Sequence, residues 1–280
     1  MVDKNKSLSP SEPEPKESSA SLARLQSILD RFEVTIAEAT DLIALEDYRI
    51  VLICDDSISM QKSALPAHVR KLGQEEDFSR WQQLQITASI MVELGCCFSM
   101  AGVDIFFLNR SNVPRVNGAN DRRFLSALKA VPSGKTRLVE TVRQAVAQCE
   151  GEKPVLFMIL TDGVPDSARQ LVDLLAEVFQ KRRPASTPAK FQILAFTPEE
   201  DEVEWLDMLS AELPQVDVTN DYHIEREQVL RSGRTNTFTR GDWVLKAMLS
   251  PITNKFDTWD ERKTYRGKTC PPVCDMCCIH

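Results

Sequence analysis

The chain is poor in histidine and lacks the sequence patterns of several enzyme classes. Its three histidines, His68, His223 and His280, lie far apart and form no H-E-x-x-H pair, so a zinc protease of that type is excluded. No G-x-S-x-G occurs, which excludes the nucleophile turn of the α/β-hydrolases. The sequence shows no internal repeat, so a solenoid or propeller is not expected.

Long apolar runs and an excess of positive charge are also missing. No stretch approaches the roughly 18 consecutive apolar residues of a membrane-spanning helix, and the first residues contain no apolar core of a secretory signal. We therefore expect a cytoplasmic protein whose eight cysteines stay reduced. The net charge is −7, with 34 Lys and Arg against 41 Asp and Glu. Because phosphate repels an acidic chain, we expect no nucleic-acid partner.

The composition indicates one large folded unit with different segments at its two ends. Hydrophobic residues make up 42% of the 280, which is enough to bury a core. Residues 1–20 are rich in Ser, Pro, Glu and Lys and are expected to be disordered. Residues 21–46 predict an amphipathic helix, which we expect to pack on the next domain rather than to form a coiled coil. That domain spans residues 47–251, and residues 252–280 form a basic, Cys-rich tail.

Continuous apolar strands alternate with amphipathic helices within the central domain. The strands are expected at residues 49–54, 103–108, 155–160 and 191–196, with a short edge strand at 216–218. Strands that are apolar throughout are buried on both faces. The pattern therefore predicts an α/β, Rossmann-like fold with a mostly parallel central sheet flanked by helices on both faces. In such sheets ligands bind beyond the carboxyl ends of the strands.

Hydroxyl and carboxylate side chains follow the expected strands. Asp55, Ser57 and Ser59 lie in the loop after the first strand, and Asp162 lies in the loop after residues 155–160. Thr136 precedes a helix between these two loops. We expect all three segments to lie at the same end of the sheet. Their hard oxygen atoms, with few charges, suit Mg²⁺, with Mn²⁺ as an alternative.

The motif D-x-S-x-S, followed by a Thr and then by Asp-Gly, resembles the metal-ion-dependent adhesion site of the von Willebrand factor A (VWA) family. The resemblance covers most of the chain. It implies that the hydroxyls of Ser57, Ser59 and Thr136 face the metal, while Asp55 and Asp162 act mostly through water or stabilise those hydroxyls. It also implies an open metal position that attracts an acidic residue of a protein partner, and a binding function without catalysis.

Two residues depart from the family pattern. Ile58 stands where the family often has Gly, and we expect it to tilt or shield the loop. Asp56 adds a second charge beside Asp55. We expect Asp56 to point to solvent, the alternative being that it raises the cation affinity and weakens the ligand position.

Three other interpretations of these residues remain. Asp55 and Asp162 could be capping or turn residues at strand ends. A Mg²⁺-dependent hydrolase could use the same loops, but the sequence shows no clear general base for it. The third is a structural scaffold with a vestigial metal site, which Ile58 favours. A phosphate-binding loop is not among these interpretations, because Lys129 stands where that motif requires Gly.

The last eleven residues contain four of the eight cysteines. Residues 277–280 resemble a C-a-a-X box, and upstream basic residues would add a second signal for peripheral membrane contact. Cys274 and Cys277 form a C-x-x-C pair of the kind found in zinc sites. An unmodified tail is the third interpretation, and the sequence leaves all three open.

Overall fold

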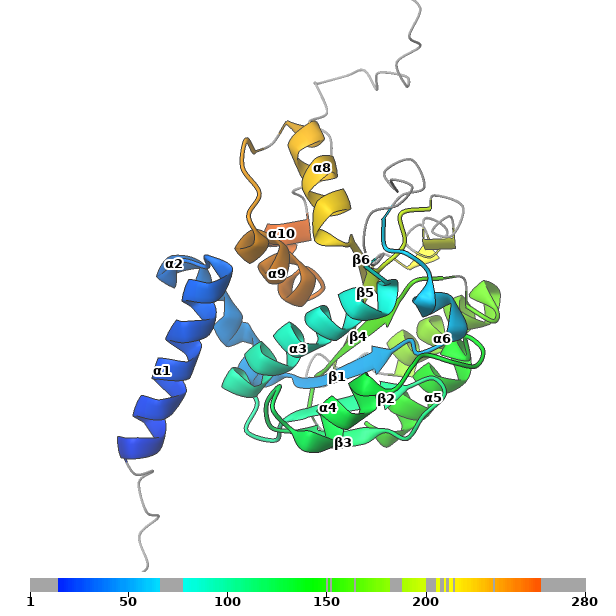
Figure 1. The fold of residues 1–280 in the computed structure, drawn as a ribbon, viewed down its shortest axis with the longest axis horizontal. Coiled ribbons are helices and arrows are strands. Elements are labelled where there is room, and N and C mark those ends of the chain that lie inside the picture. Colours follow the sequence, from blue (N-terminus) through cyan, green and yellow to red (C-terminus); the bar gives the residue numbers. More distant parts are fainter. Residues whose placement is uncertain are drawn as a thin grey trace, which may run out of the picture.

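A six-stranded sheet forms the centre of the protein, in the order β3-β2-β1-β4-β5-β6 (Figure 1). The computed structural model describes residues 15–65, 78–149, 151, 153–163, 165–181, 188–199, 205–206, 209, 212–213, 215–233 and 235–257. The strands are β1 (Arg49–Cys54), β2 (Val103–Phe107), β3 (Val113–Val116), β4 (Val155–Thr161), β5 (Ala189–Ala195) and β6 (Val216–Asn220). Among the described strands only the β2–β3 pair is antiparallel, so the prediction of a mostly parallel α/β sheet is confirmed.

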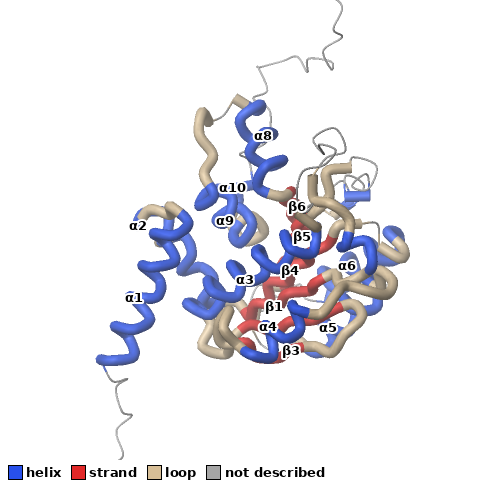
Figure 2. Tube along the Cα trace, viewed as in Figure 1, coloured by secondary structure: helices blue, strands red, loops and turns tan. Residues whose placement is uncertain are grey.

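The sheet is apolar on both faces because its strands carry apolar residues at consecutive positions. In β1, Ile50 and Leu52 pack on one face, while Val51 and Ile53 pack on the other. The first face is covered mainly by the 3₁₀ helix η1 (Asp41–Asp47), α3 (Arg80–Phe98) and α9 (Arg240–Leu249). The second is covered mainly by α5 (Leu138–Gln148) and α6 (Ala168–Lys181). Figure 2 shows the strands enclosed between these helices.

The N-terminal segment is not one helix, and its first part packs on α3 and α9, two of the helices that cover the first face of the sheet. Helix α1 begins at Pro15, within the segment expected to be disordered, and ends at Phe32. Thr35 and Glu38 then form a capping box that starts α2 (Ile36–Ala39), so the expected continuous helix over 21–46 is interrupted. The expected docking on the domain is confirmed by three buried residues, Ile28, Leu29 and Phe32.

Helix α8 (Tyr222–Ser232), which follows the edge strand β6, was not expected from the sequence pattern. Its N-cap is Asp221, whose carboxylate accepts the N–H of His223, and its C-cap is Gly233, with a positive φ of 72°. A buried ion pair of 2.5 Å between Glu225 and Lys246 joins α8 to α9. The shorter helices are α4 (Arg122–Lys129) and α10 (Asn254–Asp257).

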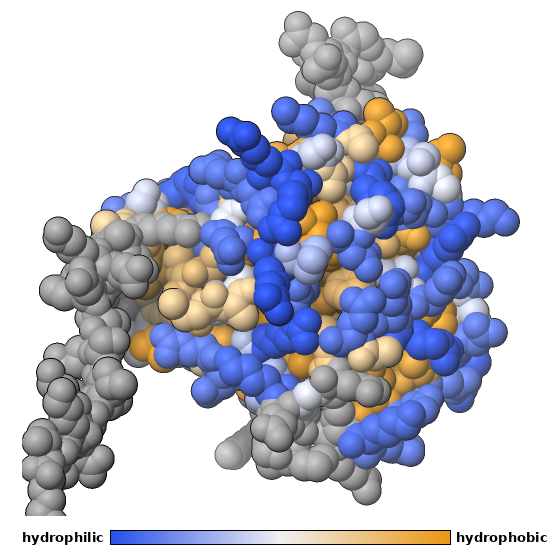
Figure 3. Space-filling view, turned by 90° about the horizontal axis from the view of Figure 1, so that it is seen from below, coloured by the Kyte–Doolittle hydropathy of each residue, from blue (hydrophilic) through white to orange (hydrophobic). Residues whose placement is uncertain are grey.

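Polar residues cover most of the outer surface in the view of Figure 3, with apolar atoms in smaller areas between them. Among the described residues, none of the helices combines the length and apolar character needed to cross a membrane. Residues 1–14 and 258–280 lie outside the described part of the chain. The lipid and zinc interpretations of the C-terminal cysteines therefore stay sequence-based hypotheses.

Candidate metal centre

The loops after β1 and β4 begin side by side at the carboxyl edge of the sheet. The N–H of Asp55 donates to the carbonyl of Leu160 at 2.8 Å, which extends the pairing of the two parallel strands to their ends. Asp55 and Asp162 are each 1% exposed. Because neighbouring parallel strands end at the same edge, two carboxylates that are distant in sequence are brought together here.

A continuous set of hydrogen bonds joins four of the five predicted site residues. The N–H of Ser57 donates to Asp55 Oδ1 at 2.9 Å, and the Oγ atoms of Ser57 and Ser59 lie 3.0 Å apart. Ser59 Oγ then donates to Asp162 Oδ1 at 2.9 Å. Thr161, which no sequence pattern marked as a site residue, donates its hydroxyl to Asp55 Oδ2 at 2.7 Å. The two loops therefore form one polar cluster.

The loop that carries Thr136 contacts the loop after β1 through backbone hydrogen bonds. Gly134 accepts the N–H of Ile58 at 3.2 Å, and Ser133 donates to the carbonyl of Asp56 at 2.8 Å. Gly134 has a φ of 91°, and a Cβ there would lie 2.3 Å from Asn109 Oδ1, so the approach requires glycine. Thr136 itself is partly exposed. Among the described residues, no hydrogen bond joins its hydroxyl to the other four site residues.

Arg80 is part of the cluster although nothing in the sequence pattern marked it. It occupies the first position of α3, directly after the capping residue Ser79, where a cation would ordinarily be expected at the surface. Instead its side chain is 1% exposed, and its Nη1 lies 3.0 Å from Asp162 Oδ2. Asp162 is thus shared between the Ser59 hydroxyl and a buried guanidinium.

The expectation that Asp56 points to solvent is wrong. Asp56 is 1% exposed, and its Oδ2 accepts the Nε–H of Arg110 at 2.5 Å. Its Oδ1 accepts the backbone N–H of Asn109 at 2.8 Å. Arg110 lies against the rings of Trp81 and Phe107, at 5.0 Å and 5.4 Å from their centroids. Burial is tolerated because this partner, far away in sequence, neutralises the carboxylate.

Ile58 lies at the surface beside the cluster. It begins the 3₁₀ helix η2 (Ile58–Gln61), a backbone conformation that a β-branched residue adopts without strain. Its side chain is 65% exposed. Val131, just before the loop that contacts Ile58, is 70% exposed. Both apolar side chains are therefore open to solvent.

Burial raises the pKa of two side chains at the end of β1, Asp55 and Cys54. Burial, followed by the charge of Asp162, raises the pKa of Asp55 to about 6, although hydrogen bonds from Ser57 and Thr161 act in the opposite direction. Burial also raises the pKa of the adjacent Cys54 thiol far above its usual range. Cys54 is therefore a neutral core residue and not a thiolate nucleophile.

We expect Asp55→Asn to change how stability depends on pH in metal-free protein. The folded-state pKa of about 6 lies above the ordinary 3.8, so folding favours the protonated acid. Its contribution to the free energy of unfolding is complete below about pH 4 and is lost as pH rises through 6, by up to about 3 kcal/mol. Urea unfolding in EDTA should show the wild type weakening relative to the variant between pH 4 and pH 8. If the free energy of unfolding depended on pH in the same way for both proteins, Asp55 would not have a raised pKa in the folded state.

The donor set fits a hard cation that keeps part of its water shell. Two carboxylates and the hydroxyls of Ser57, Ser59 and Thr136 supply only oxygen atoms, as Mg²⁺ prefers. Within the part of the chain that the structure describes, no three His, Cys, Asp or Glu side chains group closely enough to hold a metal. Any ion at this site therefore depends on the hydroxyls as well as on the acids.

No protein-family model and no curated protein matches this chain. A similar solved structure is the PilB minor pilin from Streptococcus sanguinis, with a TM-score of 0.42 and 13% sequence identity. The similarity covers 62% of this chain and 56% of the pilin chain. A likeness at this level carries no argument about function.

Proposed function

We propose that this chain is a VWA-type domain of Rossmann-like fold that binds Mg²⁺, or Mn²⁺, and uses it to bind a carboxylate on a protein partner. The proposed metal residues are Asp55, Ser57, Ser59, Thr136 and Asp162. The observation that carries the proposal is the hydrogen-bonded set from Asp55 through the two serines to Asp162. We propose a non-enzymatic role, in the cytoplasm.

The charge of the cluster supports a site that still attracts an anion once a dication is bound. Asp55 and Asp162 carry two negative charges when ionised, and the guanidinium of Arg80 offsets one of them. The charge of Asp56 is offset separately by Arg110. A bound Mg²⁺ would leave this group of side chains with a net positive charge. A partner carboxylate would then complete the metal's coordination and reduce that charge.

The exposed apolar side chains near the site suit contact with a protein surface. Ile58 is in the same loop as Ser57 and Ser59, and its N–H donates to the carbonyl of Gly134, three residues after the exposed Val131. Exposed large apolar side chains occur at protein interaction sites, where contact with the partner removes them from water. We therefore propose that Ile58 contacts the partner.

Partner capture from extract of the native host tests the proposed function. We expect the full-length protein to retain one or more proteins in Mg²⁺, to release them in EDTA, and to recover them in Mg²⁺ or Mn²⁺. Asp55→Ala should retain none of them, because it removes an acid of the metal site. Neutralising a single acidic residue of a captured partner should abolish its binding. If neither EDTA nor Asp55→Ala reduced the capture of partner proteins, the proposal would be contradicted.

A structural scaffold with a vestigial metal site is the second candidate. The observation that favours it is the buried ion pair between Arg80 and Asp162, because a guanidinium already supplies a cation to this cluster. Under this alternative, the same loops stabilise the domain without binding Mg²⁺. The response of an Arg80 variant to Mg²⁺ separates the two candidates, because only a functional site would bind the ion.

A further inference from the structure

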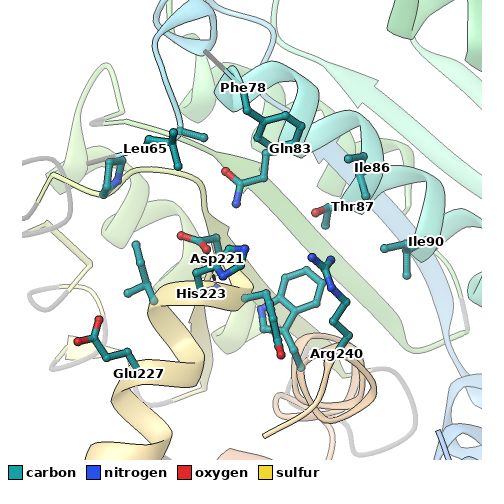
Figure 4. A pocket seen from close by; sticks show the side chains of 15 residues that line it. Leu65, Phe78, Gln83, Ile86, Thr87, Ile90, Asp221, His223, Glu227 and Arg240 are labelled. Atoms are coloured by element: carbon teal, nitrogen blue, oxygen red, sulfur yellow. Dashed lines mark hydrogen bonds between the residues drawn. The ribbon is translucent and has the colours of Figure 1, made fainter. Parts of the chain in front are cut away.

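A cavity of about 500 Å³ opens between α3, α8 and the start of α9 (Figure 4). It lies beyond the carboxyl ends of β5 and β6, since Pro198 and Asp221, which follow these strands, are part of its lining. None of the five proposed metal residues lines it. This edge of an open parallel sheet is where small ligands commonly bind.

The walls of the cavity are mainly apolar and partly open to water. Leu65, Phe78 and Ile86 line it and are 40%, 38% and 50% exposed, although large apolar side chains gain free energy when buried. Ile90 and Trp243 also line the cavity, and both are buried. The gathering of three exposed apolar side chains at one cavity indicates a surface that an apolar ligand would cover.

Arg240 supplies a cation to this apolar space. Its guanidinium lies 4.9 Å from the centroid of the Tyr222 ring and extends into the cavity in Figure 4. The side chain is exposed, and among the residues that the structure describes it forms no ion pair. Stacking on the ring holds the guanidinium in place, which lowers the entropy lost when it binds a ligand.

The acids around the cavity already have partners. Asp221 is 6% exposed, and its carboxylate caps α8 by accepting the N–H of His223 at 2.8 Å. Glu227 forms an ion pair with Arg231 on the next turn of α8. Among the described residues that line the cavity, Arg240 is therefore the permanently charged side chain without a carboxylate partner.

We propose that this cavity binds a small amphipathic monocarboxylate, with an aliphatic or aromatic body. The body would cover Leu65, Phe78 and Ile86, and the carboxylate would bind the guanidinium of Arg240. The cavity volume falls within the range of about 300–1,000 Å³ typical of small-molecule sites, which are mostly apolar with few polar groups. A planar guanidinium binds a carboxylate through two parallel hydrogen bonds, which favours this anion over an alcohol or an amine. The site does not depend on the metal centre.

Straight-chain carboxylates provide the test, using the full-length protein in EDTA and calorimetric titration. From hexanoate to octanoate to decanoate, affinity should rise about fourfold for each added methylene, as expected when each is buried. Octanol and octylamine should bind at least about tenfold more weakly than octanoate. Arg240→Gln should reduce octanoate affinity about tenfold and leave octanol unchanged. Ile86→Glu should abolish octanoate binding, because it places an anion at the mouth.

Two variants outside the cavity lining serve as controls. Arg226→Gln removes an exposed cation from α8, and Gln82→Glu adds an acid on the exposed side of α3 while keeping its capping box. Both should bind octanoate as the wild type does, and thermal melts should show all four variants folded. The proposal is overturned if no carboxylate binds, if the affinity does not change with chain length, or if octanol or octylamine binds as tightly as octanoate. It is also overturned if Arg240→Gln does not change the affinity for octanoate. The titrations are done in EDTA, so the octanoate result stands even if a separate assay shows that the protein does not bind Mg²⁺.

Discussion

Asp55→Ala should abolish Mg²⁺ binding while leaving the fold largely intact. Asp55 is one of two buried carboxylates in the cluster and also orients Ser57 through the backbone N–H that it accepts. Its removal takes away both a negative charge and the anchor of a proposed hydroxyl ligand. Calorimetric titration with Mg²⁺ should give saturable binding for the wild type and only heats of dilution for the variant. Ser57→Ala should give the same loss.

A carboxylate outside the cluster provides the matched control. Asp173 lies on α6, and its side chain is 59% exposed beside Arg169. Asp173→Ala removes the same charge from the chain and should leave the Mg²⁺ titration unchanged. Equal heats of binding for the wild type and Asp55→Ala would exclude Asp55 from the metal site.

Arg80→Ala should destabilise the metal-free protein by about 3–5 kcal/mol, and Mg²⁺ should restore part of that loss. Removing one partner of a buried ion pair leaves the other charge uncompensated, and Asp162 is 1% exposed. That loss is a large fraction of the stability of a typical domain. A bound dication would again neutralise Asp162. Urea unfolding of the variant in EDTA and in Mg²⁺ measures both effects.

The Mg²⁺ response of this variant separates the two candidate roles of the cluster. If the site is vestigial, Arg80→Ala should be equally unstable in EDTA and in Mg²⁺. Arg49→Ala is the control, because Arg49 pairs with Asp104 in the same sheet but is 37% exposed. Arg49→Ala should lower the free energy of unfolding by less than Arg80→Ala does, and Mg²⁺ should not change the stability of Arg49→Ala. Arg80→Lys keeps a cation and replaces Arg80→Ala if the latter does not fold.

The alternation of apolar strands and amphipathic helices was sufficient to predict the parallel part of the sheet. The expected strand at residues 49–54 has the observed bounds of β1, and the edge strand at 216–218 lies within β6. Apolar residues at consecutive positions leave a strand no polar face, so burial between helices follows from the sequence itself. The convergence of Asp55, Ser57, Ser59 and Asp162 follows from the same logic, because loops after neighbouring parallel strands share an edge.

Strand β3 and the capping box at Thr35 show where the pattern was insufficient. β3 contains Pro114 and Arg115, and the latter has a φ of 52°. Such a segment forms a strand only at a sheet edge, where one side needs no ladder hydrogen bonds. The capping box interrupts a helix that the apolar spacing alone predicted to be continuous.

The sequence by itself determined which loops carry the oxygen atoms of the site, because strand burial and loop position are local properties of the chain. The tertiary structure alone decided which charges are buried there. Asp56 and Arg80 both stand at positions that local pattern assigns to solvent. Each is buried because a counter-charge reaches it from a distant segment, Arg110 for Asp56 and Asp162 for Arg80. The free energy of burying a charge depends on that partner, and no local spacing encodes it.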